Sequence, residues 1–349
     1  MSEKVVLIAT TNPGIEDIAV EEVKSILHAS IIDVRENRGR IIFSIPLDRI
    51  QLIDRIKSIH RIRILLAEVD LTGSKEDLAR IRNYLRKLRL EKLISIYDKF
   101  AIRVERVGEH EYSSIDVAVE AGDEVIKYFK NLYGFRLKVD LDYPSKIIVI
   151  DVIEDRAYIS LEISGELSWH RRGYRIYEHP ASLKPTLAYA MIVLSGLRDG
   201  EVIADLMCGG GTIPIEATLV TESSRAYCMD INPKHVRGAI LNALAASVFN
   251  RINFIVGDAR RAHELFEKDS IDVVISNPPY GIRYGSPLKV RDLYTKFLES
   301  LSRVSPRRIV LITTEHNHVK SVASNIGYRI VHERRVAHGG LWPHIIVLE

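Results

Sequence analysis

The chain has 349 residues, a net charge of +3 and only two cysteines, Cys208 and Cys228. This length suits two or three domains with real cores, and two cysteines make neither a disulfide framework nor a paired metal-ligand spacing. No apolar run approaches the roughly 18–20 residues that span a bilayer, and the N-terminus lacks the features of a signal peptide. We therefore expect a cytoplasmic protein with no membrane partner.

Residues 1–165 alternate short strands with helices. The pattern predicts a strand at 5–10, helices at 15–28 and 47–59, a hairpin at 31–45 and a strand at 63–71. It then predicts helices at 75–88 and 114–134, and strands at 100–108 and within 146–164. We interpret this half as two α+β domains, at residues 1–64 and 65–165, the first of the split βαβ kind.

Two stretches of this half are strongly basic, RIKSIHRIR at 55–63 and RIRNYLRKLRLEK at 80–92. The second places Arg82, Arg86 and Arg89 at helical spacing. Such a row forms either a solvated helix face or a surface that binds RNA phosphates, and composition does not decide between them.

Residues 166–181, GELSWHRRGYRIYEHP, interrupt the regular pattern and read as a linker. Its functional candidates are Arg171, Arg172, Tyr174 and Arg175. These side chains either contact RNA phosphate and stack on a base, or pack the domains together.

Residues 182–349 form the third domain, in which strands and helices alternate regularly. We expect helices at 183–197, 213–221, 233–247, 259–267 and 291–303, strands at 201–207, 226–231, 252–258, 271–276 and 307–314, and a terminal hairpin within 328–349. Alternation of this kind is typical of a doubly wound parallel sheet.

Polar residues end the first four strands of this domain. A glycine-rich turn follows Asp205, and Asp230, Asp258 and Asn277 close the next three strands. Ligands of open α/β sheets bind at the carboxyl edge, and an acidic residue about 20 positions after a glycine turn can reach ribose hydroxyls. The sequence therefore predicts a nucleoside-containing ligand. The turn lacks GxGxxG and has no GK[ST], which excludes a dinucleotide fingerprint and a P-loop.

This order of motifs resembles the Rossmann-like S-adenosylmethionine-dependent methyltransferases. The resemblance implies that the cofactor is S-adenosyl-L-methionine and that the final hairpin supplies a reversed last strand. It implies that Asp205 and the glycines hold the methionine and ribose parts, that Asp230 binds the ribose hydroxyls, and that Asp258 and Ala259 meet the adenine. The full expected set is Thr186, Asp205, Cys208, Gly209, Gly211, Thr212, Asp230, Ile231, Asp258, Ala259 and Asn277.

The segment NPPY, residues 277–280, suits methylation of an exocyclic amine. Such an amine is a poor nucleophile, because its lone pair is delocalised into the ring. Asn277 and the carbonyl of Pro278 would accept its two hydrogens, and Tyr280 would stack on a flipped base. Catalysis would then depend on positioning more than on a strong general base. Cys208 reads as a packed residue rather than a nucleophile.

The whole chain resembles the THUMP-containing RNA methyltransferases, in which ferredoxin-like and THUMP domains precede the catalytic domain. NPPYG, RYG at 283–285 and DLYTKFL at 292–298 look like the subgroup that forms N2-methylguanosine at position 6 of the tRNA acceptor stem. The resemblance implies tRNA as partner, held at its acceptor stem and 3′ CCA end. Relatives that modify position 10 usually carry Asp in place of Asn277.

Other functions stay open at this point. They are guanine-N2 methylation elsewhere in tRNA or in 23S rRNA, methylation of a protein glutamine, and a catalytically silent RNA-binding adaptor. The basic helices count against a protein substrate, and the intact Asp205, Gly209, Asp230 and Asn277 count against an adaptor. The histidines show no metal-pair spacing, so we expect no metal, and we expect a monomer.

Overall fold

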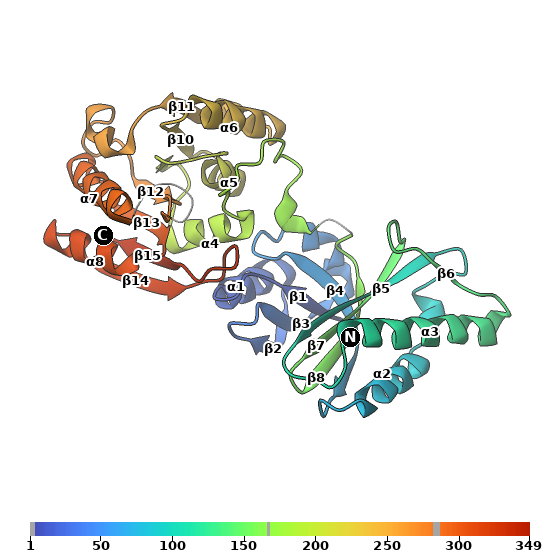
Figure 1. Ribbon diagram of the computed structural model, residues 1–349. Helices are drawn as coiled ribbons and strands as arrows, with labels where there is room; N and C mark the ends of the chain where they lie inside the picture. The colour runs from blue at the N-terminus through green and yellow to red at the C-terminus, as the bar shows by residue number, and fades with distance from the viewer. Residues whose placement is uncertain (1–3, 166–167, 282–286) are drawn as a thin grey trace.

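The computed structural model describes residues 4–165, 168–281 and 287–349, which form two lobes joined by the linker (Figure 1). Each lobe is built around one sheet, of eight strands in the N-terminal lobe and seven in the C-terminal lobe. The RYG residues 283–285 lie outside the described part of the chain.

The eight-stranded sheet has the order β2-β3-β1-β4-β8-β7-β5-β6. Its elements are β1 (Lys4–Thr10), α1 (Glu16–Leu27), β2 (Ser30–Arg35), β3 (Arg40–Pro46), η1 (Leu47–Arg55), β4 (Arg61–Asp70), α2 (Glu76–Lys87), η2 (Leu90–Lys92), β5 (Lys99–Val107), α3 (Ser114–Tyr133), β6 (Lys138–Val139), β7 (Lys146–Ile153) and β8 (Arg156–Glu162). Strand β4 pairs with β1 on one side and β8 on the other. One continuous sheet therefore runs across the domain boundary proposed at residues 64 and 65.

The predicted helix at 47–59 is instead the 3₁₀ helix η1. None of its residues is fully buried. Most helix stability in proteins comes from packing an apolar face. In η1 the apolar side chains of Ile50, Leu52 and Ile53 are only partly buried against the core. In contrast, α3 begins with a reciprocal capping box between Ser113 and Asp116 and buries Val117, Val125 and Phe129.

The seven-stranded sheet has the order β11-β10-β9-β12-β13-β15-β14. Its lobe contains η3 (Trp169–Arg171), α4 (Pro185–Ser195), β9 (Val202–Asp205), α5 (Thr212–Val220), β10 (Arg225–Asp230), α6 (Pro233–Ala245), η4 (Phe249–Arg251), β11 (Ile252–Val256), η5 (Ala259–Glu264), β12 (Val273–Ser276), α7 (Pro287–Val304), β13 (Arg308–Thr313), α8 (His316–Asn325), β14 (Ile330–Arg335) and β15 (His344–Leu348). Strand β15 is antiparallel to both of its neighbours, so the predicted reversed last strand is confirmed. The predicted helix at 259–267 is the short 3₁₀ helix η5, and α8 was not predicted.

Helices cover both faces of this sheet (Figure 1). On one face Met191 of α4 and Ile213 of α5 pack with Ile203, and on the other Phe297 of α7 and Val319 of α8 pack with Leu311. This layering confirms the doubly wound fold. Within the described residues, no helix is both long and apolar enough to cross a membrane.

The N-terminal lobe packs directly on the C-terminal hairpin. Arg334 of β14 donates two hydrogen bonds to the carboxylate of Asp17 on α1, at 2.7 and 2.9 Å. The Ala337 amide donates to the Pro13 carbonyl at 2.9 Å, and Asn12 Nδ2 donates to the Ala337 carbonyl at 3.0 Å. These contacts join the two sheets through specific side chains.

Candidate active site

The polar strand ends gather at the carboxyl edge of the seven-stranded sheet, as parallel pairing requires. Strand β9 is central, with β10 on one side and β12 on the other. Asp205 and Asp230 are the last residues of β9 and β10, and Asn277 directly follows β12. The parallel registers therefore bring these three side chains to one edge.

Asp205 ties two of these loops together. It is 2% exposed, and its Oδ1 accepts from Ser276 Oγ at 2.6 Å and from the Met207 amide at 3.2 Å. Burial raises the pKa of its carboxyl to about 7. Asp205 thus holds the start of the glycine turn against the end of β12. Sequence reasoning did not identify Ser276, whose small hydroxyl ends an otherwise apolar strand.

The glycine turn is fastened to β10. The Gly209 amide donates to Asp230 Oδ2 at 2.9 Å, and the Cys208 amide donates to the Met229 carbonyl at 2.8 Å. Gly211 has a φ of 77°, and a Cβ there would lie 2.9 Å from Ala239 Cβ, so both conformation and space require glycine. Helix α5 begins at the next residue, so its N-terminus opens at the carboxyl edge.

Cys208 is a packed residue in the structure. It is 7% exposed, and burial raises the pKa of its thiol well above the ordinary value. The neighbouring Cys228 is also buried. Because the thiolate is the nucleophilic form, this environment does not support covalent catalysis by Cys208.

Asp230 keeps room for a ribose. Its two oxygens accept from the Gly209 amide, from the Asn232 amide at 2.9 Å and from His235 Nδ1 at 3.2 Å. A carboxylate has about four acceptor positions, so one is left for a hydroxyl group. Ile231 follows with 63% of its surface exposed, which leaves an apolar face for a base beside the ribose position.

Two histidines that sequence reasoning missed border this position. The rings of His179 and His235 meet edge to face, with centroids 4.4 Å apart. A Cβ at Gly209 would lie 3.4 Å from the His179 ring, so the linker passes close to the glycine turn. Neither histidine belongs to a local motif, because the linker and α6 meet only in the folded chain.

Asp258 lies at the expected strand end but pairs with its own loop. Its carboxylate caps η5 by accepting from the Arg260 amide at 3.0 Å, and it also accepts from the Arg260 guanidinium at 3.0 Å. The hydrogen bond from Arg260 is the main cause of its lowered pKa. Ala259 beside it is buried. An adenine amino group at this place would have to share Asp258 with Arg260.

The Asn277 amide is held at both ends. Its Nδ2 donates to the Ala181 carbonyl at 3.2 Å, and its Oδ1 accepts from the Tyr280 hydroxyl at 2.8 Å. Burial raises the pKa of Tyr280, so the hydroxyl stays neutral and can donate. Pro278 is buried and Pro279 is exposed. The linker carbonyl of Ala181 was not predicted, because no side-chain pattern marks a backbone acceptor.

The structure does not bring Thr186 to these strand ends. Thr186 is fully buried, and its Oγ1 donates to Asn12 Oδ1 at 2.6 Å and lies 3.0 Å from His60 Nε2. It joins the two lobes. Thr212, at the start of α5, does lie at the edge, with its Oγ1 3.4 Å from Ser182 Oγ.

The linker candidates divide into two kinds. Arg172 and Tyr174 both contact Glu216 of α5, a fully buried carboxylate, with Arg172 Nε at 3.1 Å and the Tyr174 hydroxyl at 2.7 Å. Arg172 also donates to the Lys57 carbonyl at 3.0 Å. These two residues therefore pack the domains. Arg171 and Arg175 are not fully buried.

The three arginines of the basic helix region have acidic neighbours. Arg82 pairs with Glu120, Arg86 with Glu124 and Arg89 with Glu91, at 2.9, 2.9 and 3.2 Å. Each arginine side chain is at least 42% exposed, and the Arg82–Glu120 pair is exposed on both sides, so this pair is weak and can exchange for phosphates. Arg86 instead makes two hydrogen bonds to the nearly buried carboxylate of Glu124.

A second basic surface lies between the lobes, as a cleft of about 620 Å³. Its basic side chains come from both lobes and the linker, and the exposed Trp342 adds an aromatic ring. They are Arg38, Arg40, Arg61, Arg171 and Lys184. Sequence reasoning named only Arg171 among them as a candidate for RNA. Arg61 belongs to the basic stretch at 55–63, and the other three are scattered along the chain.

Comparison with known proteins gives matches over the whole chain. Residues 172–344 match the family described as RMKL-like, methyltransferase domain, and residues 75–162 match the THUMP domain. The tRNA (guanine(6)-N2)-methyltransferase of Methanocaldococcus jannaschii is 34% identical over 97% of this chain and 98% of its own length. The crystal structure of TrmN from Thermus thermophilus superposes with a TM-score of 0.84 at 27% identity, covering 99% of both chains.

A further solved structure, of a methyltransferase complexed with SAH, shares the fold with a TM-score of 0.82 at 19% identity, over 99% of this chain and 98% of that one. The predicted THUMP region and methyltransferase domain are thereby confirmed. The chain belongs to the family of THUMP-containing S-adenosylmethionine-dependent methyltransferases that includes the tRNA (guanine(6)-N2)-methyltransferases.

Proposed function

We propose that this protein methylates the exocyclic N2 amine of a guanosine in tRNA, at position 6 of the acceptor stem. The observation that carries the proposal is the amide of Asn277, fixed at the end of β12 beside the glycine turn. The names of full-length relatives support the choice of nucleotide, and the THUMP domain supports tRNA as partner.

The residues at the carboxyl edge fit the cofactor that this reaction needs. S-adenosylmethionine, when bound, supplies an electrophilic methyl group. Asp230 offers a free acceptor position for ribose, Ile231 an exposed apolar face for adenine, and the N-terminus of α5 a place for a carboxylate. Gly209 and Gly211 keep this space clear, because a side chain there would enter it or clash with its walls.

The protein's part in the reaction is to orient the guanine amine. The Ala181 carbonyl prevents the Asn277 amide from turning over, so Oδ1 faces the Tyr280 side. A carbonyl oxygen has two lone pairs, and Tyr280 uses one, which leaves one for a substrate N–H. The Pro278 carbonyl would take the other hydrogen, and the amine lone pair would then point at the methyl group.

The basic cleft between the lobes suits the RNA backbone. Lys184 and Arg171 line it, and among the described residues of its lining Glu105 is the only acidic one. Cations of this kind bind phosphates in a salt-dependent way. We assign this cleft, together with the exposed arginines of α2, to the tRNA.

Nucleoside mass spectrometry tests the proposal. Unmodified tRNA transcript is incubated with enzyme and isotope-labelled S-adenosylmethionine, digested, and analysed for labelled N2-methylguanosine. We expect label in tRNA with G6 and none in a matched transcript with A6. A second transcript that lacks the CCA end should react more slowly while cofactor binding is unchanged. Equal labelling of the G6 and A6 transcripts would contradict the proposed site.

A further inference from the structure

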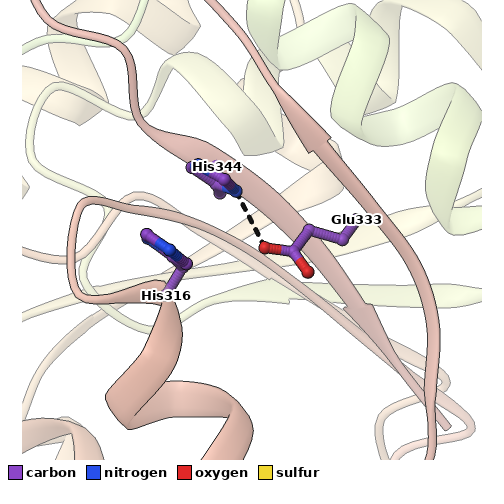
Figure 2. Close-up of side chains that lie close together, drawn as sticks. All are labelled: His316, Glu333 and His344. Atoms are coloured by element: carbon purple, nitrogen blue, oxygen red, sulfur yellow. Dashed lines mark hydrogen bonds and ion pairs between the residues drawn. The ribbon is translucent and has the colours of Figure 1, made fainter.

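Three side chains from three successive elements near the end of the chain meet beside α8 (Figure 2). His316 is the first residue of α8, Glu333 lies on β14, and His344 is the first residue of β15. None of the three is fully exposed. They serve neither the cofactor position nor the Asn277 site, from which β13 separates them.

The three side chains are arranged around a common point. One ligand atom from each lies within 4.8 Å of the others. His344 Nδ1 hydrogen-bonds Glu333 Oε1 at 2.8 Å, and the two imidazole rings stack with centroids 3.8 Å apart at 7° (Figure 2). Imidazole and carboxylate are the donors that zinc and similar ions take in proteins.

One of these donors lacks a partner. His316 Nδ1 is buried, and within the described residues no hydrogen bond satisfies it. A buried polar nitrogen without a partner is destabilising. Stacking between the two histidines leaves the His316 Nδ1 atom without a partner. A ligand bound to that nitrogen would supply one.

We propose that His316, Glu333 and His344 bind a divalent transition-metal ion, with Zn²⁺ as the best match. Tetrahedral Zn²⁺ with bonds of about 2.0–2.1 Å separates its donors by roughly 3.4 Å. The three donors already lie within 4.8 Å of one another, and binding requires the two stacked rings to turn out of parallel so that both nitrogen lone pairs point at the ion. The proton between His344 Nδ1 and Glu333 Oε1 moves by way of solvent to His344 Nε2, so that the neutral imidazole offers its Nδ1 lone pair to the ion, and water would fill the fourth position.

The ion would fasten α8 to the terminal hairpin. Beyond β14 the hairpin leads to Ala337, which hydrogen-bonds the N-terminal lobe at Pro13. A metal at the base of the hairpin thus stiffens a segment that the lobes share. The role is structural, because the three protein ligands cross-link α8, β14 and β15.

One neighbouring residue opposes metal binding, and its replacement should therefore increase the affinity for the ion. Lys320 Nζ lies 2.9 Å from Glu333 Oε2 and places a positive charge beside the site. Removal of that charge, as in Lys320→Met, should tighten the metal. A cluster that serves only as a hydrogen-bonded stack would show no such gain.

The experiment uses the full chain without an affinity tag, freed of metal with a chelator and titrated with ZnCl₂ by calorimetry. CoCl₂ in parallel reports tetrahedral coordination through its visible absorption. We expect one ion per chain and a rise in melting temperature on loading. Glu333→Gln and His344→Ala should each weaken binding at least about 100-fold, since even outer-shell partners account for 10–100-fold.

His318→Ala is the matched control. It lies two residues after His316 on α8, but its Nε2 bonds the Arg291 carbonyl at 3.0 Å, outside the cluster. The control should bind Zn²⁺ like the parent protein. Two results would overturn the proposal and leave an adventitious ion only. One is a stoichiometry below one ion per chain, and the other is an affinity that His344→Ala and Glu333→Gln leave unchanged. Glu333→Gln keeps the shape of the side chain, so the test stands even if His344→Ala folds poorly.

Discussion

The Tyr280 hydroxyl donates a hydrogen bond to Asn277 Oδ1 across 2.8 Å. In the proposed reaction the same oxygen accepts a hydrogen bond from the guanine amine. Tyr280 therefore does more than offer a ring for stacking, because its hydroxyl fixes the orientation of the acceptor. With Nδ2 held on the Ala181 carbonyl, the Asn277 amide is set before any substrate arrives.

Replacement of Asn277 by alanine should lower turnover while cofactor affinity stays nearly unchanged. The interaction with the amine strengthens in the transition state, so its loss affects kcat more than binding. By analogy with an oxyanion-hole donor the cost is about 2.7–4 kcal/mol, or roughly a hundred- to a thousandfold. Single-turnover kinetics with saturating tRNA measures it, and a wild-type rate would disprove the role of Asn277.

The two functions of Tyr280 can be separated by two variants. Tyr280→Phe keeps the ring and loses one neutral hydrogen bond, so we expect a cost of about 0.5–1.5 kcal/mol, roughly tenfold at most. Tyr280→Ala also loses the stacking surface, at about 1–3 kcal/mol for one base. The second variant should raise KM for tRNA, whereas the first should act mainly on kcat. Equal KM values in both variants would argue against stacking.

Asp230→Ala should weaken S-adenosylmethionine binding by about 1.5–3 kcal/mol, the value of a hydrogen bond to a charged group. Isothermal titration calorimetry provides the measurement. His235→Ala is the control, because His235 touches Asp230 at 3.2 Å without being assigned to the cofactor. The control should show the smaller loss. If both variants bound like the parent protein, the ribose would have another ligand.

The free energy of unfolding should decrease as pH rises, because of Asp205. Its carboxyl has an unfolded pKa of 3.8 and a folded pKa of about 7. Between these values the folded protein holds a proton that the unfolded chain releases, so stability falls as pH rises through this window and levels above it. The total is on the order of 4 kcal/mol.

Asp205→Asn removes this titration and still accepts from Ser276. Denaturant unfolding at pH 5 and pH 8 should show a smaller drop for the variant than for the parent. An identical drop in both proteins would mean that Asp205 titrates normally in the fold.

Arg172→Ala should destabilise the protein by about 3 kcal/mol or more, because it leaves the Glu216 charge buried without its cation. The Arg172 side chain is 12% exposed and Glu216 is fully buried. Arg82→Ala is the control, since the side chains of Arg82 and Glu120 are 42% and 38% exposed and their pair should contribute about 0–1 kcal/mol. Melting temperatures separate the two. Loss of RNA affinity without loss of stability in Arg172→Ala would instead favour an RNA contact.

Periodicity and strand ends predicted the catalytic domain well, because each signal is local. Asp205, Asp230 and Asn277 follow buried strands, and parallel pairing brings such ends together whatever the helices do. The contacts that were not predicted join distant segments. Ala181 on Asn277, His235 on Asp230 and Thr186 on Asn12 each depend on how the chain packs. The type of element was predicted wrongly for η1, a 3₁₀ helix in which no residue is fully buried.

The pairing of β4 with both β1 and β8 joins the N-terminal half into one continuous sheet. The hydrogen-bonded ion pair between Asp17 and Arg334 then attaches this sheet to the catalytic domain. If the N-terminal lobe binds one end of the tRNA, the distance between that binding site and Asn277 is constant, and the enzyme measures a fixed distance along the RNA. The modified nucleotide would then be chosen by its distance from the end of the RNA rather than by the bases around it.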